Sequence, residues 1–249
     1  METASWRDRV DAILVAWQPG IEGGNSVADI LSGKVNPSGK LTMTWPISVY
    51  DHPSTANYAK KYDMYTYTNM QDGSKPGIDF NNHEEDIYVG YRYFDTFKKN
   101  VAYPFGYGLS YTTFEFGKPS VKANGNTIEV SVNVKNTGKV AGKQVAEVYV
   151  TAPKGAYEKP AKELKTFGKT KELKPGESQT LKMTLEKRDL ASFDEANSQW
   201  KVDAGNYIFK VGTDVENIKG TATLKVGEYT EKVSNACPVN VQMKYLKQK

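Results

Sequence analysis

The stretch Val10-Asp-Ala-Ile-Leu-Val-Ala-Trp-Gln-Pro-Gly-Ile-Glu-Gly-Gly-Asn25 decides the fold class of the first part of this 249-residue chain. Its apolar run, residues 11–17, is bounded by Pro19 and Gly20, which is typical of a central strand buried on both faces. A glycine turn and a helix are predicted to follow. Because an α/β layer needs several strands side by side and helices on both faces, and little sequence precedes Val10, we expect only part of such a domain.

The helix is predicted to begin near Gly23, with Asn25 or Ser26 as its N-cap. Val27, Ile30 and Leu31 would then share one face, and Gly33 stands where a glycine ends a helix. After the turn Asn36-Pro-Ser-Gly39, apolar and polar residues alternate over 40–45 up to Pro46. This alternation predicts a half-exposed strand.

Composition limits the kinds of protein and site that the chain can form. Its 39% hydrophobic and 25% charged residues are typical of globular domains. We find no apolar run of the roughly 18 residues needed for a membrane span, and no signal-peptide pattern. With one cysteine, Cys237, and two histidines, His52 and His83, we expect no intramolecular disulfide, no zinc or iron–sulfur site and no cofactor.

Charge is distributed unevenly along the chain. Residues 1–115 carry 10 Lys/Arg against 14 Asp/Glu, whereas residues 116–249 carry 23 against 15. The lysines of the second half alternate with strand-forming residues, as on the solvated face of a sheet. Its single arginine, Arg188, argues against a nucleic-acid surface, which would combine clustered arginines with aromatic platforms.

Residues 47–87 form a long segment rich in Tyr, Asn, Asp and Gly, and it contains Tyr58, Tyr62, Tyr65 and Tyr67. Loops of this length are usually packed or functional. We favour a loop that packs over a neighbouring domain. The alternative is a loop whose rings line a sugar-binding cleft.

The following segment is too aromatic for a surface linker. It contains Ile87-Tyr-Val-Gly-Tyr-Arg-Tyr-Phe-Asp95 and Tyr103-Pro-Phe-Gly-Tyr-Gly-Leu-Ser-Tyr-Thr-Thr-Phe-Glu-Phe116, and we expect it to pack against another part of the fold. Gly106-Tyr-Gly108 is not a phosphate-binding loop, because no helix signal follows it and neither nucleotide fingerprint is complete.

Beyond Phe116 the sequence changes to short strands separated by turns. Asn124-Gly125 is a strong hairpin signal, and further strands are predicted at 143–150, 161–167, 178–185 and 205–212. Six or seven such strands fit an immunoglobulin-like or fibronectin type III-like sandwich. The expected domains are therefore a partial α/β sandwich with the tyrosine-rich loop (1–86), an aromatic connector (87–116), the fibronectin-like sandwich (117–226) and a C-terminal tail (227–249).

Taken in order, these motifs resemble the C-terminal part of a family 3 glycoside hydrolase. The matching stretches are Ala16-Trp-Gln-Pro-Gly-Ile-Glu-Gly-Gly-Asn25, Asn36-Pro-Ser-Gly-Lys-Leu41, Tyr88-Val-Gly-Tyr-Arg-Tyr-Phe-Asp95, Pro104-Phe-Gly-Tyr-Gly-Leu-Ser-Tyr-Thr112 and, in the sandwich, Asn136-Thr-Gly, Leu173-Lys-Pro-Gly-Glu177 and Gly205-Asn-Tyr207. The resemblance implies an exo-acting, retaining β-glucosidase or β-xylosidase. It also implies a periplasmic or secreted parent enzyme.

Retention requires two carboxylates about 5–5.5 Å apart. In the family, the nucleophile is an aspartate of an N-terminal (β/α)8 barrel, and the acid/base glutamate lies upstream of the strand that opens this chain. Neither has a counterpart here, so we assign no catalytic, cofactor-binding or metal-binding residue. We expect the chain to support a catalytic barrel, with a barrel-containing polypeptide or a second copy of itself as partner and a β-linked oligosaccharide or aryl glycoside as the parent enzyme's substrate.

Several residues could be mistaken for site residues. For Glu22 we favour an interaction with the unpaired N–H groups of the following helix, and for Glu84, Glu85 and Asp86 a solvated turn or an ion pair with Arg92. Arg92 itself is expected to be a buried structural cation. Trp17 and Trp45 are expected to be core residues rather than sugar platforms. The alternative function is a non-catalytic carbohydrate-binding or adhesion module.

Overall fold

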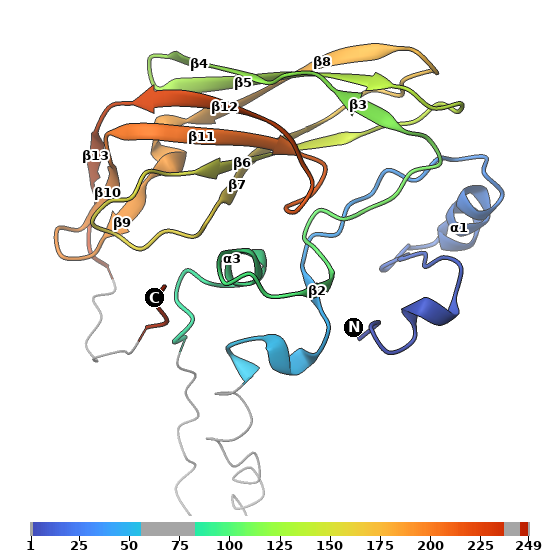
Figure 1. Ribbon diagram of the computed structural model, residues 1–249, viewed down its shortest axis with the longest axis horizontal. Coiled ribbons are helices and arrows are strands. Elements are labelled where there is room, and N and C mark those ends of the chain that lie inside the picture. Colours follow the sequence, from blue (N-terminus) through green and yellow to red (C-terminus); the bar gives the residue numbers. More distant parts are fainter. Residues whose placement is uncertain (1, 56–82, 237–244, 249) are drawn as a thin grey trace, which may run out of the picture.

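The computed structural model describes residues 2–55, 83–236 and 245–248, and its largest element is a β-sandwich (Figure 1). In one sheet, the central strand β5 (Thr127–Asn136) pairs with β8 (Ser178–Glu186) and with β3 (Phe114–Phe116) and β4 (Ser120–Asn124). The facing sheet has the order β12-β11-β6-β7, with bounds Ile218–Val226, Gly205–Gly212, Val145–Thr151 and Glu163–Lys169. Each strand pair is antiparallel.

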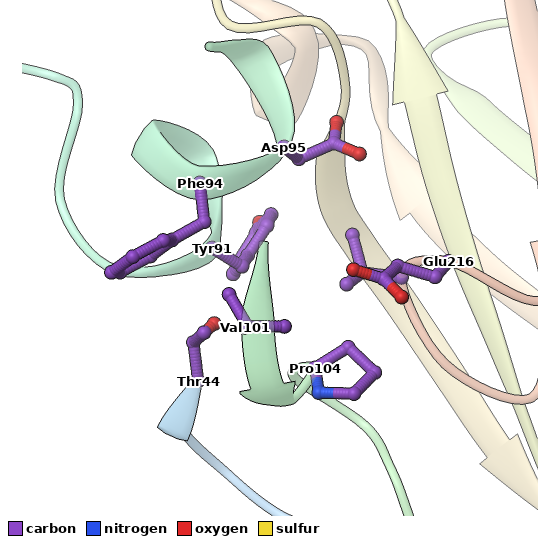
Figure 2. A pocket seen from close by; sticks show the side chains of 8 residues that line it. Thr44, Tyr91, Phe94, Asp95, Val101, Pro104 and Glu216 are labelled. Carbon is purple, nitrogen blue, oxygen red and sulfur yellow. The ribbon is translucent and has the colours of Figure 1, made fainter. Parts of the chain in front are cut away.

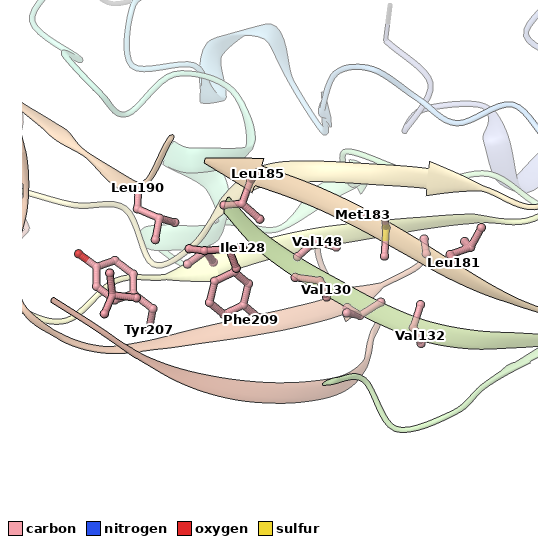
Figure 3. Packing of buried hydrophobic residues seen from close by; sticks show 14 of the residues in the cluster. Ile128, Val130, Val132, Val148, Leu181, Met183, Leu185, Leu190, Tyr207 and Phe209 are labelled. Atoms are coloured by element: carbon pink, nitrogen blue, oxygen red, sulfur yellow. The ribbon is translucent and has the colours of Figure 1, made fainter. Parts of the chain in front are cut away.

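The core of the sandwich lies between these sheets, where inward side chains of β5, β8, β6 and β11 meet (Figure 3). Ile128, Val130, Val132 and Val134 alternate along β5 with outward residues, and all four are buried. Phe209 of β11 is fully buried against them. Burying each such side chain contributes about 1.5–3 kcal/mol, so this cluster is the main source of stability.

Smaller elements extend the sandwich at one end. Strands β9 (Ser192–Asp194), β10 (Gln199–Val202) and β13 (Tyr229–Lys232) form a three-stranded sheet with β10 in the centre. The 3-10 helix η4 (Lys187–Leu190) leads into it and buries Leu190 in the core.

The described residues that precede the sandwich form few regular elements. They are η1 (Arg7–Arg9), α1 (Gly23–Leu31), the two-stranded pair β1 (Trp45–Pro46) and β2 (Val101–Tyr103), η2 (Val49–Asp51) and α3 (Tyr91–Thr96). The chain leaves α1, passes beneath the sandwich and returns through α3 and β2 (Figure 1). None of the described helices is both long and apolar enough to cross a membrane.

The strand predicted at residues 11–17 is not formed. This segment forms no helix or strand, its residues Leu14 and Trp17 are exposed, and Trp17 has a φ of 52°. A strand needs a neighbour to satisfy its backbone N–H and C=O groups, and no described strand pairs with this one. The strand predicted over 40–45 is likewise reduced to β1, although Leu41 exchanges two backbone hydrogen bonds with residues 106 and 107.

The predicted helix is present, but its start differs from the expectation. Its N-cap is Glu22 rather than Asn25 or Ser26, and no side chain caps it. Its end agrees with the sequence, because Gly33 directly follows the C-cap Ser32 and has a φ of 77°, the left-handed conformation that glycine adopts without strain.

The fibronectin-like sandwich predicted from the sequence is confirmed. The hairpin at Asn124-Gly125 is present, with Asn124 opposite Thr127 and Gly125 at a φ of 63°. The strands predicted at 143–150, 161–167, 178–185 and 205–212 correspond to β6, β7, β8 and β11. Strands β3, β9, β10, β12 and β13 were not predicted. The fold is therefore a small α/β segment followed by an all-β sandwich.

Candidate functional site

Strand β6 is buried on both faces, so another part of the chain must cover the outer side of its sheet. Ala146, Val148 and Val150 point into the sandwich core, whereas Glu147 and Tyr149 point the other way and are also buried. The cover is the segment from α3 to residue 108, which lies against this sheet (Figure 1). We call the contact between this segment, residues 36–41 and the outer side of the β12-β11-β6-β7 sheet the junction.

A buried carboxylate lies at the centre of the junction. Glu147 is 5% exposed and accepts a short hydrogen bond from the hydroxyl of Tyr149. Burial raises the pKa of Glu147 to about 7, against the opposing effects of the Tyr149 hydrogen bond and the Lys40 ammonium, while Asp214 adds to the increase. Burial and the neighbouring Glu147 carboxylate also raise the pKa of Tyr149. Glu147 therefore titrates near neutral pH.

Lys40 brings a cation to this carboxylate from the first part of the chain. Its ammonium donates to the carbonyl oxygen of Gly108 at 3.1 Å, and burial lowers the pKa of Lys40. The backbone of Leu41 pairs with residues 106 and 107, with Leu41 N to Tyr107 O at 2.9 Å and Gly106 N to Leu41 O at 2.8 Å. These bonds join residues 40–41 to the segment that covers Glu147.

A second anchor of the junction is Asn36. Its side-chain amide donates to Ala141 O at 2.9 Å, and its carbonyl oxygen accepts from Ser110 Oγ and Tyr111 N, each at 2.9 Å. One side chain thus joins the first part of the chain, the connector and a loop of the sandwich. The hydroxyl of Tyr111 in turn donates to Ile30 O at the end of α1.

Helix α3 is attached to the start of β7 by polar contacts. The hydroxyl of Tyr91 accepts from Leu164 N at 2.8 Å, Arg92 pairs with Glu163 at 3.3 Å, and Lys162 forms a short ion pair with Asp95. The Tyr91 ring also packs edge-on against Tyr149, with centroids 6.0 Å apart. Since the helix has only six residues, these contacts rather than its own hydrogen bonds hold it in place.

A small cavity lies beside the junction and contains the carboxylates of Asp95 and Glu216 in its lining (Figure 2). The lining residues are Thr44, Tyr91, Phe94, Asp95, Val101, Pro104, Val215 and Glu216. Its volume is about 10 Å³, room for about one water molecule. Burial raises the pKa of Glu216, and Asp214 and Asp95 add to this increase. Two acids therefore lie near one another here, but no sugar ring fits between them.

The carboxylates considered from the sequence lie apart from the junction. Glu22 accepts from Asn25 Nδ2 at 2.6 Å and does not bond to the helix N–H groups, so the expected side-chain cap is absent. Glu84, Glu85 and Asp86 lie in a turn, where Glu85 contacts His83 Nδ1 at 3.2 Å and Glu84 O accepts from Leu246 N.

The other residues considered from the sequence have mixed outcomes. Arg92 is one-third exposed rather than buried, and it forms an ion pair with Glu163 of β7. Trp17 is 56% exposed, which contradicts its predicted core position, because the strand that would bury it is not formed. Trp45 is 4% exposed and packs edge-on against Tyr103, as predicted. Tyr58, Tyr62, Tyr65, Tyr67 and Cys237 lie outside the described residues.

Sequence reasoning missed Glu147, Lys40 and Asn36 as junction residues. One signal was available: β6 reads Val-Ala-Glu-Val-Tyr-Val, a strand with a single charge among large apolar residues. Such a strand is expected when both faces are covered, and its glutamate then needs partners. Lys40 and Asn36 carried no such signal, because their role depends on contacts between distant parts of the sequence.

The junction is a closely packed contact between two parts of the chain. In residues 2–55, 83–236 and 245–248, no three His, Cys, Asp or Glu side chains are grouped so that they could hold a metal ion. Glu147 is enclosed, and the adjacent cavity admits one water at most. The arrangement fixes the first part of the chain on the sandwich.

Comparison with known protein families agrees with this architecture. Residues 1–111 match the glycosyl hydrolase family 3 C-terminal domain, and residues 144–215 match the fibronectin type III-like domain. These matches confirm the resemblance drawn from the sequence motifs.

Individual relatives share the same region. The chain is 40% identical to a β-glucosidase of Kluyveromyces marxianus, over 89% of this chain and 24% of the relative, and 41% identical to β-glucosidase A of Butyrivibrio fibrisolvens, over 92% and 29%. It therefore spans about a quarter of the length of these relatives.

Solved structures give the same result in three dimensions. β-Glucosidase 3B of Thermotoga neapolitana, solved in complex with glucose, superposes with a TM-score of 0.82 at 46% identity, over 94% of this chain and 31% of that one. A family 3 β-glucosidase of Bifidobacterium adolescentis superposes with a TM-score of 0.81 at 37% identity, over 92% and 32%.

Proposed function

Because this chain carries the C-terminal domain of glycosyl hydrolase family 3 followed by a fibronectin type III-like domain, we propose that it supports the catalytic barrel of a retaining, exo-acting β-glucosidase. In this role the chain contributes no catalytic carboxylate. The nucleophile and the acid/base come from polypeptide outside these residues, and the substrate is a β-linked oligosaccharide or aryl glucoside.

The observation that carries this proposal is the extent of the match. Similarity to β-glucosidases continues across 89% of the chain in sequence and 94% in structure, yet it accounts for only 24% and 31% of the two relatives. The matched part is thus a defined region of a larger enzyme. The absence of a sugar-sized space between Asp95 and Glu216 agrees with a supporting role for this region.

The apolar surface around α1 supports a docking role. Ile21 is fully exposed, Leu31 is 69% exposed and Trp17 is 56% exposed, and α1 buries none of its larger side chains. Helix α1 lies at the end of the structure away from α3 (Figure 1). Exposed large apolar residues concentrated in one segment are typical of interaction surfaces, and we assign this segment to the barrel-bearing part of the enzyme, or to a second copy of the chain when that part is missing.

A chimera tests this proposal. The corresponding C-terminal region of the Thermotoga neapolitana enzyme is replaced by this chain, and hydrolysis of an aryl β-glucoside is compared for the chimera, the parent enzyme and a truncated enzyme without the region. We expect the chimera to be active and the truncated enzyme to be inactive. This chain alone is assayed as the control and is expected to show no turnover.

Two results would contradict the proposal. Robust hydrolysis by this chain alone would show that it holds its own catalytic pair. Equal activity of the truncated enzyme and the chimera would show that the region does not support the barrel.

A further inference from the structure

An open hollow lies between η2 and α3, apart from the junction and from the surface around α1. Its volume is about 370 Å³, within the range of roughly 300–1,000 Å³ that is typical of small-ligand pockets. The residues that line it are Ile47, Tyr50, Asp51, Tyr93, Lys99 and Asn100. In Figure 1, the light-blue segment with η2 lies below α3.

Local structure holds the ring of Tyr93 and the backbone of Tyr50. The Tyr93 ring packs against Phe97 and Phe94, with centroids 5.1 and 5.3 Å away. Tyr50 belongs to η2, whose first turn is closed by a capping box in which Ser48 N donates to Asp51 Oδ2 at 2.8 Å. The Tyr50 side chain is nevertheless 81% exposed, so a large ring is fixed at its base and left open to solvent.

Most polar side-chain groups of the hollow have no hydrogen-bond partner among the residues that the structure describes. Within the described part of the chain, no hydrogen bond engages the hydroxyls of Tyr50 and Tyr93, the ammonium of Lys99 or the side-chain amide of Asn100. Asp51 uses Oδ2 for the capping box, which leaves its other oxygen as an acceptor. Donors and acceptors thus line the hollow together with the exposed Tyr50 ring, and its charged residues are one cation, Lys99, and one anion, Asp51.

We propose that this hollow binds a neutral saccharide of one or two pyranose rings. A pyranose has apolar C–H faces that pack on aromatic rings and hydroxyl edges that need both donors and acceptors, which is the combination present here. The offsetting charges disfavour a phosphate or another anion. This inference goes beyond the proposed function, because it gives the chain a ligand site of its own, separate from the barrel.

The test measures binding of cellobiose to the full chain by saturation-transfer NMR and calorimetry. We expect saturable binding with a Kd in the millimolar range. Because Tyr50 supplies an exposed ring, Tyr50→Ala is expected to weaken binding about tenfold or more. Asn100→Ala is expected to weaken it less. Phe167→Ala, which removes an exposed ring from β7 (67% exposed), is the matched control and should bind like the parent.

The possible outcomes distinguish saccharide binding at the hollow from a role of the hollow as a protein contact. No saturable binding of cellobiose, or equal binding by Tyr50→Ala and the parent at an unchanged unfolding midpoint, overturns it. If Tyr50→Ala leaves cellobiose binding intact but impairs assembly of the chimera described above, the hollow is a protein contact and the proposal is wrong. An inactive chimera with normal cellobiose binding would contradict only the proposed function.

Discussion

Gly106 lies directly against the carboxylate of Glu147. A Cβ added to Gly106 would come 2.3 Å from Oε2 and 2.7 Å from Oε1, and Gly106 itself has a φ of 84°. The connector can cover this buried acid only because the residue above it has no side chain. Backbone conformation and close approach both require glycine here.

The first prediction concerns Gly106→Ala. The substitution forces alanine into the left-handed region and pushes a methyl group into the Glu147 carboxylate, so we expect the free energy of unfolding to fall by about 2–4 kcal/mol. Gly176→Ala is the matched control, because Gly176 has nearly the same φ, 82°, but nothing within 4 Å of the added Cβ. It should cost only about 1 kcal/mol. Urea unfolding measures both, and equal losses would show that the contact with Glu147 is unimportant.

The second prediction concerns pH. Burial raises the pKa of Glu147 to about 7 from an ordinary value of 4.5. Between these values the folded state binds more protons than the unfolded state, so the contribution of Glu147 is fully present below pH 4.5 and is lost as pH rises through 7. The free energy of unfolding falls by on the order of 2–3 kcal/mol over this pH range.

Glu147→Gln removes this titration. We therefore expect the stability of the variant, measured relative to the parent by urea unfolding, to increase between pH 5 and pH 8 by on the order of 2 kcal/mol. Glu115→Gln, at an exposed glutamate of β3, is the control for the removal of a carboxylate from the surface. If the Glu147→Gln and parent profiles run parallel, the buried acid does not titrate in this range.

The third prediction concerns Asn36→Ala. The change removes three hydrogen bonds that join three segments of the chain, and we expect a loss of about 2–3 kcal/mol. Asn133→Ala removes an exposed amide with one long contact of 3.4 Å to Thr180, and it should change stability by less than about 0.5 kcal/mol. Similar unfolding midpoints for the two variants would mean that Asn36 does not hold the junction together.

The sandwich could be predicted from sequence because its strands obey a local rule. Along β8, buried Leu181, Met183 and Leu185 alternate with exposed residues, and this period of two is visible without any partner. The strand predicted at residues 11–17 is not formed for the opposite reason. An apolar run becomes a strand only when other strands satisfy its backbone, and sequence alone does not say whether those strands are present.

The junction was harder to predict than the sandwich, although the aromatic connector was expected to pack against something. The identity of its partners depends on tertiary contacts: Glu147 meets Gly106 and Lys40, which lie in other parts of the sequence. The signal in β6 was a charge among buried residues. It indicated that the outer face is covered, but not by which segment.

The last prediction concerns the apolar surface around α1. In the chain alone this surface lacks the barrel-bearing part that we assign to it, so we expect concentration-dependent self-association in sedimentation velocity. The double variant Ile21→Asp with Leu31→Asp places charges at two exposed positions. It should shift the chain toward monomer with little change in its unfolding midpoint, because neither side chain packs in the core.

The control is Phe167→Asp, which also changes an exposed apolar residue but lies on the sandwich. It should associate like the parent. If Phe167→Asp abolishes self-association and the double variant does not, the chain associates through the sandwich, and the surface around α1 is not its docking face.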